Sequence, residues 1–342
     1  MGKVMGDTAG TTSTILASLG DRLGLFKNLA AEGPATSSEL AARTGIKERY
    51  AREWLAAMFA NGYLEYDPTS RRFTLPAEYQ PVLAQENGPY FFGGIHQTVM
   101  SWPGILDQLQ QAFRHGGGVP QSAYSDDMWD GFERFSNGWF ENLLLQQWLP
   151  AMPDALAALE RGAEVADVGC GRGRALIKLA QAFPNSRFVG YDVFAPTIER
   201  ARANAEAAGV ADRIRFQTLD AAQGLPGQYD IITTFDVIHD AVDPRGILRT
   251  IRQALRPNGT YICLEINVSD KLEENANPIA AFFYGASNLY CMTTSLAGGG
   301  AALGTAGMPE KTTLELCKEA GFSHARRVPL ENPFNNLFEA RP

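Results

Sequence analysis

A histidine and an aspartate stand side by side in the stretch FDVIHDAVDP, at positions 235–244. The apolar segment YDIITTF just before them predicts a buried strand, so His239 and Asp240 should lie where that strand ends. Histidine has an ordinary pKa near ~6.5, which makes it the usual side chain for removing a proton at neutral pH. His239 is therefore a candidate general base, and the alternatives are a metal ligand or a polar residue that caps the strand.

A cluster of glycines follows an earlier predicted strand. The stretch VADVGCGRGRA contains Asp167, Gly169, Gly171 and Gly173 in the pattern D-x-G-x-G-x-G. Glycines at a strand-to-helix turn let a ligand lie against the backbone at a helix N-terminus. The dinucleotide fingerprint would need Gly or Ala at the next position, which is Arg174. The pattern therefore indicates a nucleoside site of another kind.

An aspartate follows each of the next two predicted strands. Asp192 lies in FVGYDV, about twenty residues after the glycines, where a carboxylate can accept hydrogen bonds from both ribose hydroxyls. Asp220 lies in FQTLDAA, where it can accept from an adenine amino group or, alternatively, cap a helix. The order and spacing of the glycines and the two aspartates favour the nucleoside site.

The elements that must position these residues alternate between strand and helix patterns from about residue 163 onward. This alternation predicts βαβ units and a parallel sheet with helices on both faces. We expect a winged-helix domain over residues 1–82, a helical segment over 83–150 that forms part of a substrate pocket, and a catalytic domain over 151–342. A long insertion interrupts the catalytic domain at about 268–309.

The winged-helix prediction comes from residues 36–75. Thr36 and Glu39 form a T-x-x-E capping box, a longer amphipathic helix runs from Lys47 to about Ala60, and GYLEYD and RRFTL alternate like two strands. Such a module binds DNA or mediates dimerisation. Six basic and five acidic residues between 35 and 75 leave a surplus of one positive charge, which favours dimerisation.

The composition is typical of a soluble enzyme that acts on small molecules. The chain has 342 residues and a formal net charge of −8, which argues against nucleic acid as the main partner. No apolar run is long enough to span a membrane, and the start of the chain lacks the pattern of a signal peptide. Four cysteines without CxxC spacing suit a reducing cytoplasm and no structural zinc.

The glycine pattern, Asp192 and Asp220 together resemble the class I S-adenosylmethionine-dependent methyltransferases over roughly residues 160–340. The resemblance implies a Rossmann-like α/β fold with a seven-stranded methyltransferase sheet and S-adenosylmethionine as the cofactor. It extends the expected cofactor contacts to Ala221 and Phe235.

With its N-terminal winged helix and aromatic helical middle, the whole chain resembles the plant-type small-molecule O-methyltransferases. The resemblance implies that His239 is the base for a hydroxyl acceptor, that Glu265 in YICLEI and Glu310 in MPEKTT orient it, and that the enzyme is a homodimer of secondary metabolism. The chain departs from the family at Ala241, where a tryptophan is usual. The residues expected to face a small, aromatic or natural-product acceptor are Trp102, Trp139, His239, Asp240 and Tyr290.

The chain also resembles bacterial methyltransferases that act on a carbon of α-keto acids. Some of these hold a metal with a His-Asp pair and a second histidine that precedes Cys-Met. This chain has Tyr290 before Cys291, and although Cys291 or His96 could substitute, we predict no metal and keep metal-assisted C-methylation as the alternative. A winged-helix regulator that senses S-adenosylmethionine, or a cofactor-assisted reaction other than methyl transfer, are further alternatives.

Overall fold

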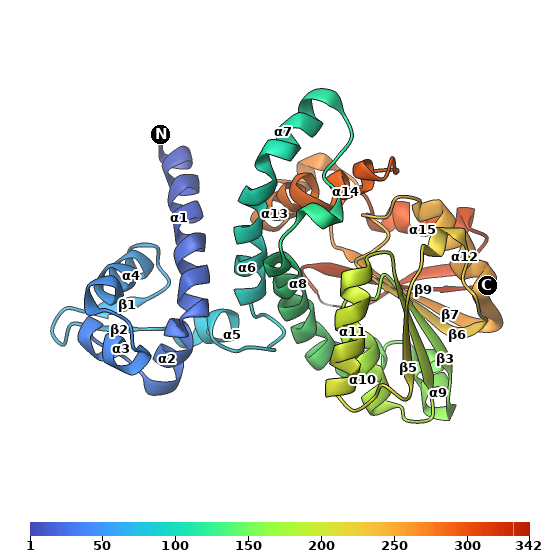
Figure 1. Ribbon diagram of the computed structural model, residues 1–342, viewed down its shortest axis with the longest axis horizontal. Helices are drawn as coiled ribbons and strands as arrows, with labels where there is room; N and C mark the ends of the chain where they lie inside the picture. Colours follow the sequence, from blue (N-terminus) through green and yellow to red (C-terminus); the bar gives the residue numbers. More distant parts are fainter. Residues whose placement is uncertain (331) are drawn as a thin grey trace. The chain divides into compact units, whose positions relative to one another are not determined.

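The computed structural model describes residues 1–330 and 332–342, which form two compact units. The first unit consists of Met1–Pro103 and Ser125–Asn142, and the second of Gly104–Tyr124 and Leu143–Pro342. The winged helix lies in the first unit and the large sheet in the second (Figure 1). The boundary between the units divides the segment 83–150, which the sequence analysis treated as one element.

The first unit folds as a helical module with a small hairpin. Thr36 and Glu39 form the expected capping box, because the Thr36 side chain accepts from the Glu39 N–H while the Glu39 carboxylate accepts from the Thr36 N–H. The elements of this unit are α1 (Gly2–Arg22), α2 (Leu25–Glu32), α3 (Ser37–Thr44), α4 (Glu48–Ala60), β1 (Glu65–Asp67), β2 (Arg72–Thr74), η1 (Ala77–Tyr79), α5 (Gln80–Leu83), α6 (Gly93–Ser101) and α8 (Asp126–Trp139).

Ion pairs occupy three arginines of the winged helix. On α4, Arg49 pairs with Glu53 at 2.5 Å and Arg52 pairs with Glu48 at 2.7 Å. On β2, Arg72 pairs with Glu39 at 2.5 Å. Each of these positive charges is offset by a carboxylate of the same module, so the module offers little electrostatic gain to a phosphate backbone.

The second unit contains a seven-stranded sheet in the order β5-β4-β3-β6-β7-β9-β8. All neighbouring strands are parallel except at β9, which runs antiparallel to both β7 and β8. This confirms the α/β class and the seven-stranded methyltransferase sheet. The strands are β3 (Glu164–Val168), β4 (Arg187–Asp192), β5 (Ile214–Thr218), β6 (Tyr229–Phe235), β7 (Leu255–Ile266), β8 (His324–Val328) and β9 (Asn335–Arg341).

Helices cover both faces of this sheet. Apolar side chains of α12 and α15 pack with residues of β3, β6, β7 and β9 in one core cluster. The helical elements of the second unit, with two that cross the boundary between the units, are η2 (Trp102–Ile105), α7 (Leu106–His115), η3 (Gln121–Ala123), η4 (Phe140–Trp148), α9 (Pro153–Arg161), α10 (Arg174–Ala182), α11 (Ala195–Ala207), η5 (Ala221–Gln223), α12 (Pro244–Ala254), η6 (Leu272–Asn275), α13 (Pro278–Ala286), η7 (Ser287–Cys291), α14 (Met292–Ala297) and α15 (Glu310–Glu319).

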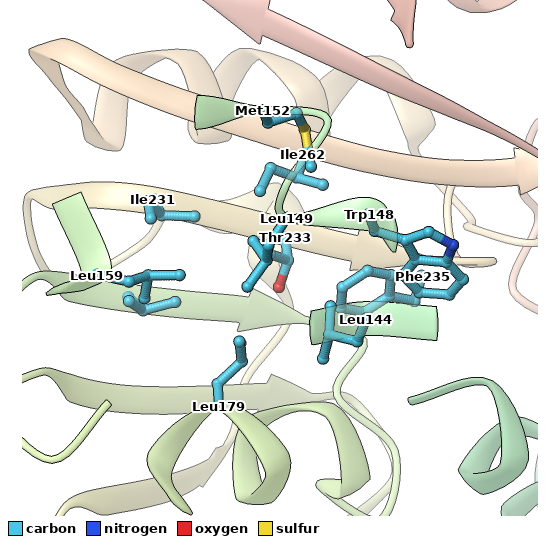
Figure 2. Close-up of a pocket in the computed structure, with 11 residues that line it drawn as sticks. Leu144, Trp148, Leu149, Met152, Leu159, Leu179, Ile231, Thr233, Phe235 and Ile262 are labelled. Atoms are coloured by element: carbon cyan, nitrogen blue, oxygen red, sulfur yellow. The ribbon is translucent and has the colours of Figure 1, made fainter. Parts of the chain in front are cut away.

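A small cavity lies between the sheet and the layer formed by η4, α9 and α10. Figure 2 shows the Trp148 ring beside the Phe235 ring at one end of it, and the two rings stack with centroids 5.9 Å apart. Thr233 is the polar residue among its lining side chains, and the Thr233 hydroxyl already donates to Asp167. The cavity is therefore part of the hydrophobic core, and the acid–base chemistry lies elsewhere.

The cysteines and the hydropathy of the helices agree with the composition. All four cysteines are buried, and none forms a disulfide. In the described part of the chain, no helix combines the length and the apolar character needed to cross a bilayer.

Candidate active site

A buried hydrogen bond joins His239 to Glu265. His239 follows β6, Glu265 lies near the end of the neighbouring parallel strand β7, and the His239 Nδ1 atom is 2.7 Å from the Glu265 Oε2 atom. The other carboxylate oxygen of Glu265 accepts from the Ile238 N–H at 2.9 Å. His239 is 3% exposed and Glu265 is fully buried, so both side chains are held firmly.

The carboxylate determines the acid–base character of the histidine. Burial by itself lowers the pKa of His239, but Glu265 and the neighbouring Cys291 thiol raise it more, so the pKa lies well above its usual value. With Nδ1 bonded to Glu265, the other ring nitrogen, Nε2, is the atom that can accept a proton. The hydrogen bond is the one that a base with an orienting carboxylate would make, and the catalytic role of His239 and Glu265 remains a prediction.

Three other side chains gather near His239. One ligand-type atom each of His239, Asp240 and Cys291 lies within 4.8 Å of the other two. Burial raises the pKa of Asp240 to about 7, with opposing contributions from His239, which lowers it, and Glu265, which raises it. Tyr290 precedes Cys291 on η7; burial raises the pKa of Tyr290, and the Asp240 carboxylate adds to this effect.

Glu310, expected to orient the base, contacts an arginine instead. It is the first residue of α15, and its carboxylate accepts from Arg327 of β8 at 3.2 Å. Its side chain is 46% exposed, in contrast to the fully buried Glu265. The structure therefore does not bring Glu310 to His239, and its orienting role remains a prediction.

The insertion at 268–309 is fastened to the loop that carries the base. The Gly304 N–H donates to the His239 carbonyl at 2.9 Å, and the Ala301 N–H donates to the Val242 carbonyl at 3.0 Å. Between them, the Ser295 hydroxyl donates to the Ala241 carbonyl at 2.8 Å. These bonds hold the backbone on both sides of Asp240.

Residues 119–124, which precede the strands of the second unit in the sequence, also pack on this insertion. The Val119 N–H donates to the Thr293 hydroxyl at 2.9 Å, and the Tyr124 hydroxyl donates to the Leu289 carbonyl at 2.6 Å. The Gln121 amide donates to the Tyr290 hydroxyl at 3.3 Å. These residues support the part of η7 that carries Tyr290 next to the base.

The glycine loop lies at the same edge of the sheet, after β3. Asp167 at the end of β3 accepts from the Thr233 hydroxyl at 2.6 Å, and burial raises the pKa of Asp167 to about 7. Asp192, the last residue of β4, accepts from the Gly171 N–H and the Phe194 N–H, both at 2.9 Å. Burial raises the pKa of Asp192, while these two donors lower it. Asp192 thus fixes the loop and is still half-buried rather than enclosed.

The remaining predicted cofactor residues follow β5 and β6. Asp220 is exposed and caps η5 by accepting from the Ala222 N–H at 3.0 Å, which is the alternative role considered for it. Ala221 is buried, and its carbonyl accepts from the Thr250 hydroxyl at 2.6 Å. Phe235 ends β6 and stacks on Trp148. Contact of these three residues with a cofactor remains a prediction.

The loop fits an adenosyl ligand by its shape and by the acceptor beside it. Gly171 has φ of 50°, and a Cβ placed on it would meet no atom within 4 Å, so this side of the loop is open. The half-buried Asp192 carboxylate is adjacent to this open side, because it is bonded to the Gly171 N–H. A carboxylate at the end of the second strand suits a pair of ribose hydroxyls.

Comparison with known proteins identifies both units. A methyltransferase domain matches residues 159–309, and an Rv2258c-like winged HTH domain matches residues 11–85. O-demethylpuromycin-O-methyltransferase of Streptomyces alboniger is 27% identical over 340 residues, which covers 90% of this chain and 84% of the relative. The chain is an S-adenosylmethionine-dependent methyltransferase.

Other curated relatives of this methyltransferase match over shorter stretches. The chain spans 23%, 44% and 45% of three of them, which include ubiquinone biosynthesis O-methyltransferases. Solved structures share the fold over nearly the full length. A candidate O-methyltransferase from Nostoc punctiforme has a TM-score of 0.75 at 22% identity and covers 100% of this chain and 99% of its own. The mitomycin 7-O-methyltransferase has a TM-score of 0.68 at 20% identity, with 99% and 97% covered.

Not every predicted residue of the methyltransferase lies in the second unit. Trp102 and Trp139 are both buried in the first unit, and their contact with an acceptor remains a prediction. Sequence reasoning also missed one acidic residue beside the base, Asp236, whose carboxylate lies near His239 and Glu265. Its position in FDVIHD, three residues before the histidine, was the available signal.

Two alanine substitutions should separate the structural and the ligand-facing glycines of the loop. At Gly173, with φ of 78°, a Cβ would lie 2.6 Å from the Phe216 ring, whereas at Gly171 it would meet nothing. We expect Gly173→Ala to lower the free energy of unfolding by about 1–3 kcal/mol more than Gly171→Ala, since only the former adds overlap to backbone strain. Urea denaturation of both variants measures this difference.

For cofactor affinity, the expected order of the two variants is reversed, with the larger loss in Gly171→Ala. Gly171→Ala should weaken the binding of S-adenosylhomocysteine measured by calorimetry, because its methyl group would extend into the open side of the loop. Equal unfolding free energies for the two variants would contradict the overlap expected at Gly173. Unchanged affinity in Gly171→Ala would show that this loop does not hold the cofactor.

Proposed function

We propose that this methyltransferase transfers the methyl group to a hydroxyl oxygen of a small organic acceptor, an aromatic compound or another natural product. The observation that carries the proposal is the 2.7 Å bond between His239 and Glu265. His239 follows β6, which pairs with β3, the strand that leads into the glycine loop. The proposed base and the cofactor loop therefore share the edge of the sheet where ligands bind in such folds. The name of the Streptomyces relative supports an oxygen acceptor.

The residues at this edge of the sheet would have separate roles in cofactor binding and proton transfer. S-adenosylmethionine, when bound, supplies an electrophilic methyl group on a sulfonium. Gly169, Gly171 and Gly173 would shape the loop against it, while Asp192 would bind the ribose. His239 would remove the acceptor proton at Nε2, and Glu265 would hold the ring and stabilise the imidazolium.

Exclusion of water makes that proton transfer effective. The base is almost fully buried, and the insertion bonded to its loop helps to exclude water from it. Alignment of acceptor and methyl group should provide most of the rate acceleration, and the base should add roughly 10²–10⁴-fold.

Replacing the histidine tests this assignment. His239→Ala should lower turnover by roughly 10²–10⁴-fold and leave the affinity for S-adenosylhomocysteine within a few-fold, because the cofactor is bound by other residues. Because His239 must be neutral to act and its pKa is raised, the wild-type rate should increase with pH through a midpoint above 6.5. The assay follows labelled methyl transfer to an acceptor found by screening small hydroxyl compounds, with the product mass checked for one added methyl group.

The matched control is His324→Ala, which removes an exposed histidine from β8. This variant should keep the turnover and the affinity for S-adenosylhomocysteine of the wild type. If His239→Ala also retained turnover within a few-fold of the wild type, His239 would have no part in the mechanism.

Metal analysis distinguishes oxygen methylation from the metal-assisted carbon reaction. Although His239, Asp240 and Cys291 come close together, the Nδ1 atom of the histidine already bonds Glu265, and we expect no ion there. Protein purified without chelators should contain iron, zinc and cobalt far below one ion per chain, and EDTA should leave turnover unchanged. One ion per chain and loss of turnover in EDTA would favour C-methylation of an α-keto acid.

We also propose that the enzyme is a cytoplasmic homodimer that uses α1 as part of its interface. Val4, Met5, Ile15 and Leu19 on this helix and Leu23 at its C-cap are between 43% and 69% exposed. Most of them recur at helical spacing and form an apolar stripe, which is costly to leave in water. The four reduced, buried cysteines suit a cytoplasmic location.

Charge placed on this stripe should separate the subunits. The double substitution Ile15→Glu and Leu19→Glu should convert the full-length protein from a dimer to a monomer in sedimentation velocity. Leu272→Glu changes a leucine that is 72% exposed in the second unit and should leave the dimer intact. A wild-type monomer, or a dimer that persists in the double variant, would contradict the proposal.

A further inference from the structure

An acidic residue adopts an unusual backbone conformation just before the catalytic loop. Asp236 follows the last residue of β6 and has φ of 56°, in the left-handed region. Its N–H still donates to the Leu264 carbonyl at 2.9 Å, so the turn occurs while the β6–β7 ladder continues. Asp and Asn adopt this conformation at a lower cost than other residues with a Cβ.

The side chain of Asp236 is held from a third strand. The Asn335 amide of β9 donates to both carboxylate oxygens, at 2.8 and 3.1 Å. Asn335 is 1% exposed, so this donor cannot readily be replaced by water. Because β9 pairs with β7 and places Asn335 opposite Ile266, the strand next to the one that carries Glu265 fixes the Asp236 carboxylate.

This carboxylate faces the base and its partner. One atom each of Asp236, His239 and Glu265 lies within 4.8 Å of the other two. Glu310, by contrast, bonds Arg327 and is half-exposed. The structure thus supplies two carboxylates for one imidazole, a fully buried one from β7 and a half-buried one just after β6.

We propose that Asp236 is a positioning residue of the base, and that its carboxylate, held by Asn335, is the second acidic group that acts on His239. The proposal rests on the proposed function, since it needs His239 to accept a proton. Asp236 itself would not touch the acceptor. It would act through the charge and the orientation of the His239 ring.

The charges around His239 determine whether Asp236 favours its protonated or its neutral form. When His239 takes up a proton, a positive charge appears in a buried site where it must be balanced. The groups facing this charge are Glu265 from β7, Cys291 from η7, and Asp236 and Asp240 from the two sides of the loop. Burial raises the pKa of Asp236 to about 7, with Glu265 raising it and His239 lowering it. A charged Asp236 therefore stabilises the protonated histidine.

The experiment measures the titration of His239 directly and needs no acceptor. Full-length protein labelled with ¹⁵N-histidine is titrated by NMR, and the His239 signals are assigned with the His239→Ala variant. Asp236→Asn removes the charge but suits the left-handed conformation, and its carbonyl can still accept from Asn335. We expect the pKa of His239 to fall by about one pH unit in this variant, because an adjacent opposite charge is lost.

Glu310→Gln is the matched control, since it removes the same charge from the carboxylate expected from the family. It should leave the His239 titration unchanged, and the exposed His324 serves as an internal reference in every spectrum. If Asp236→Asn does not fold, Asn335→Ala gives the second test. It removes the donor that favours the charged carboxylate, so the pKa of His239 should again fall.

An unchanged His239 titration in Asp236→Asn, or a shift in Glu310→Gln that exceeds it, would overturn the proposal. A uniform change of all histidine signals in Asp236→Asn would reflect a loss of structure, and an unchanged His239 titration in Asn335→Ala would then overturn the proposal. Full turnover in His239→Ala is a different outcome: it would remove the base and hence the proposed function, whatever the titration shows about the coupling of Asp236 to His239.

Discussion

The hydrogen bond between His239 and Glu265 is the constraint around which the second unit is organised. A carboxylate that is removed from water costs several kcal/mol unless its oxygens find donors. Glu265 meets this requirement with the His239 ring on one oxygen and the Ile238 N–H on the other. Both donors come from the loop after β6, so the pairing of β6 with β7 decides where the imidazole lies.

The parts of the site that the sequence predicts are those that follow from strand order. A parallel sheet brings the ends of its strands to one edge, so the glycine loop, Asp192, Asp220 and His239 could be placed together from pattern alone, whereas Glu265 came from the family resemblance. The capping box of α3 was equally readable, because three residues of local sequence determine it. The capping box joins residues that are close along the chain, and the hydrogen-bonded ladder of the sheet sets the distances between the strand ends.

The surroundings of the base depend on longer-range geometry, and there the sequence was less informative. Whether Glu310 or Asp236 reaches the imidazole depends on how α15 and β9 pack on the sheet, and on a positive φ that no pattern of apolar residues reveals. The contacts of Gln121 and Tyr124 with η7 join residues more than 160 positions apart. The segment 83–150 was expected to act as a single element, but the structure divides it between two units.

The bonds between the insertion and the base loop bear on how this enzyme could be re-engineered. Ser295, Ala301 and Gly304 are tied to backbone carbonyls of the loop at residues 239–242. An insertion transplanted from a relative to change the acceptor would have to reproduce those three attachments, or the imidazole would be displaced together with the graft. Diversification is therefore better directed at the stretch before Ser287, which makes none of these three bonds, than at the glycine-rich return that follows α14.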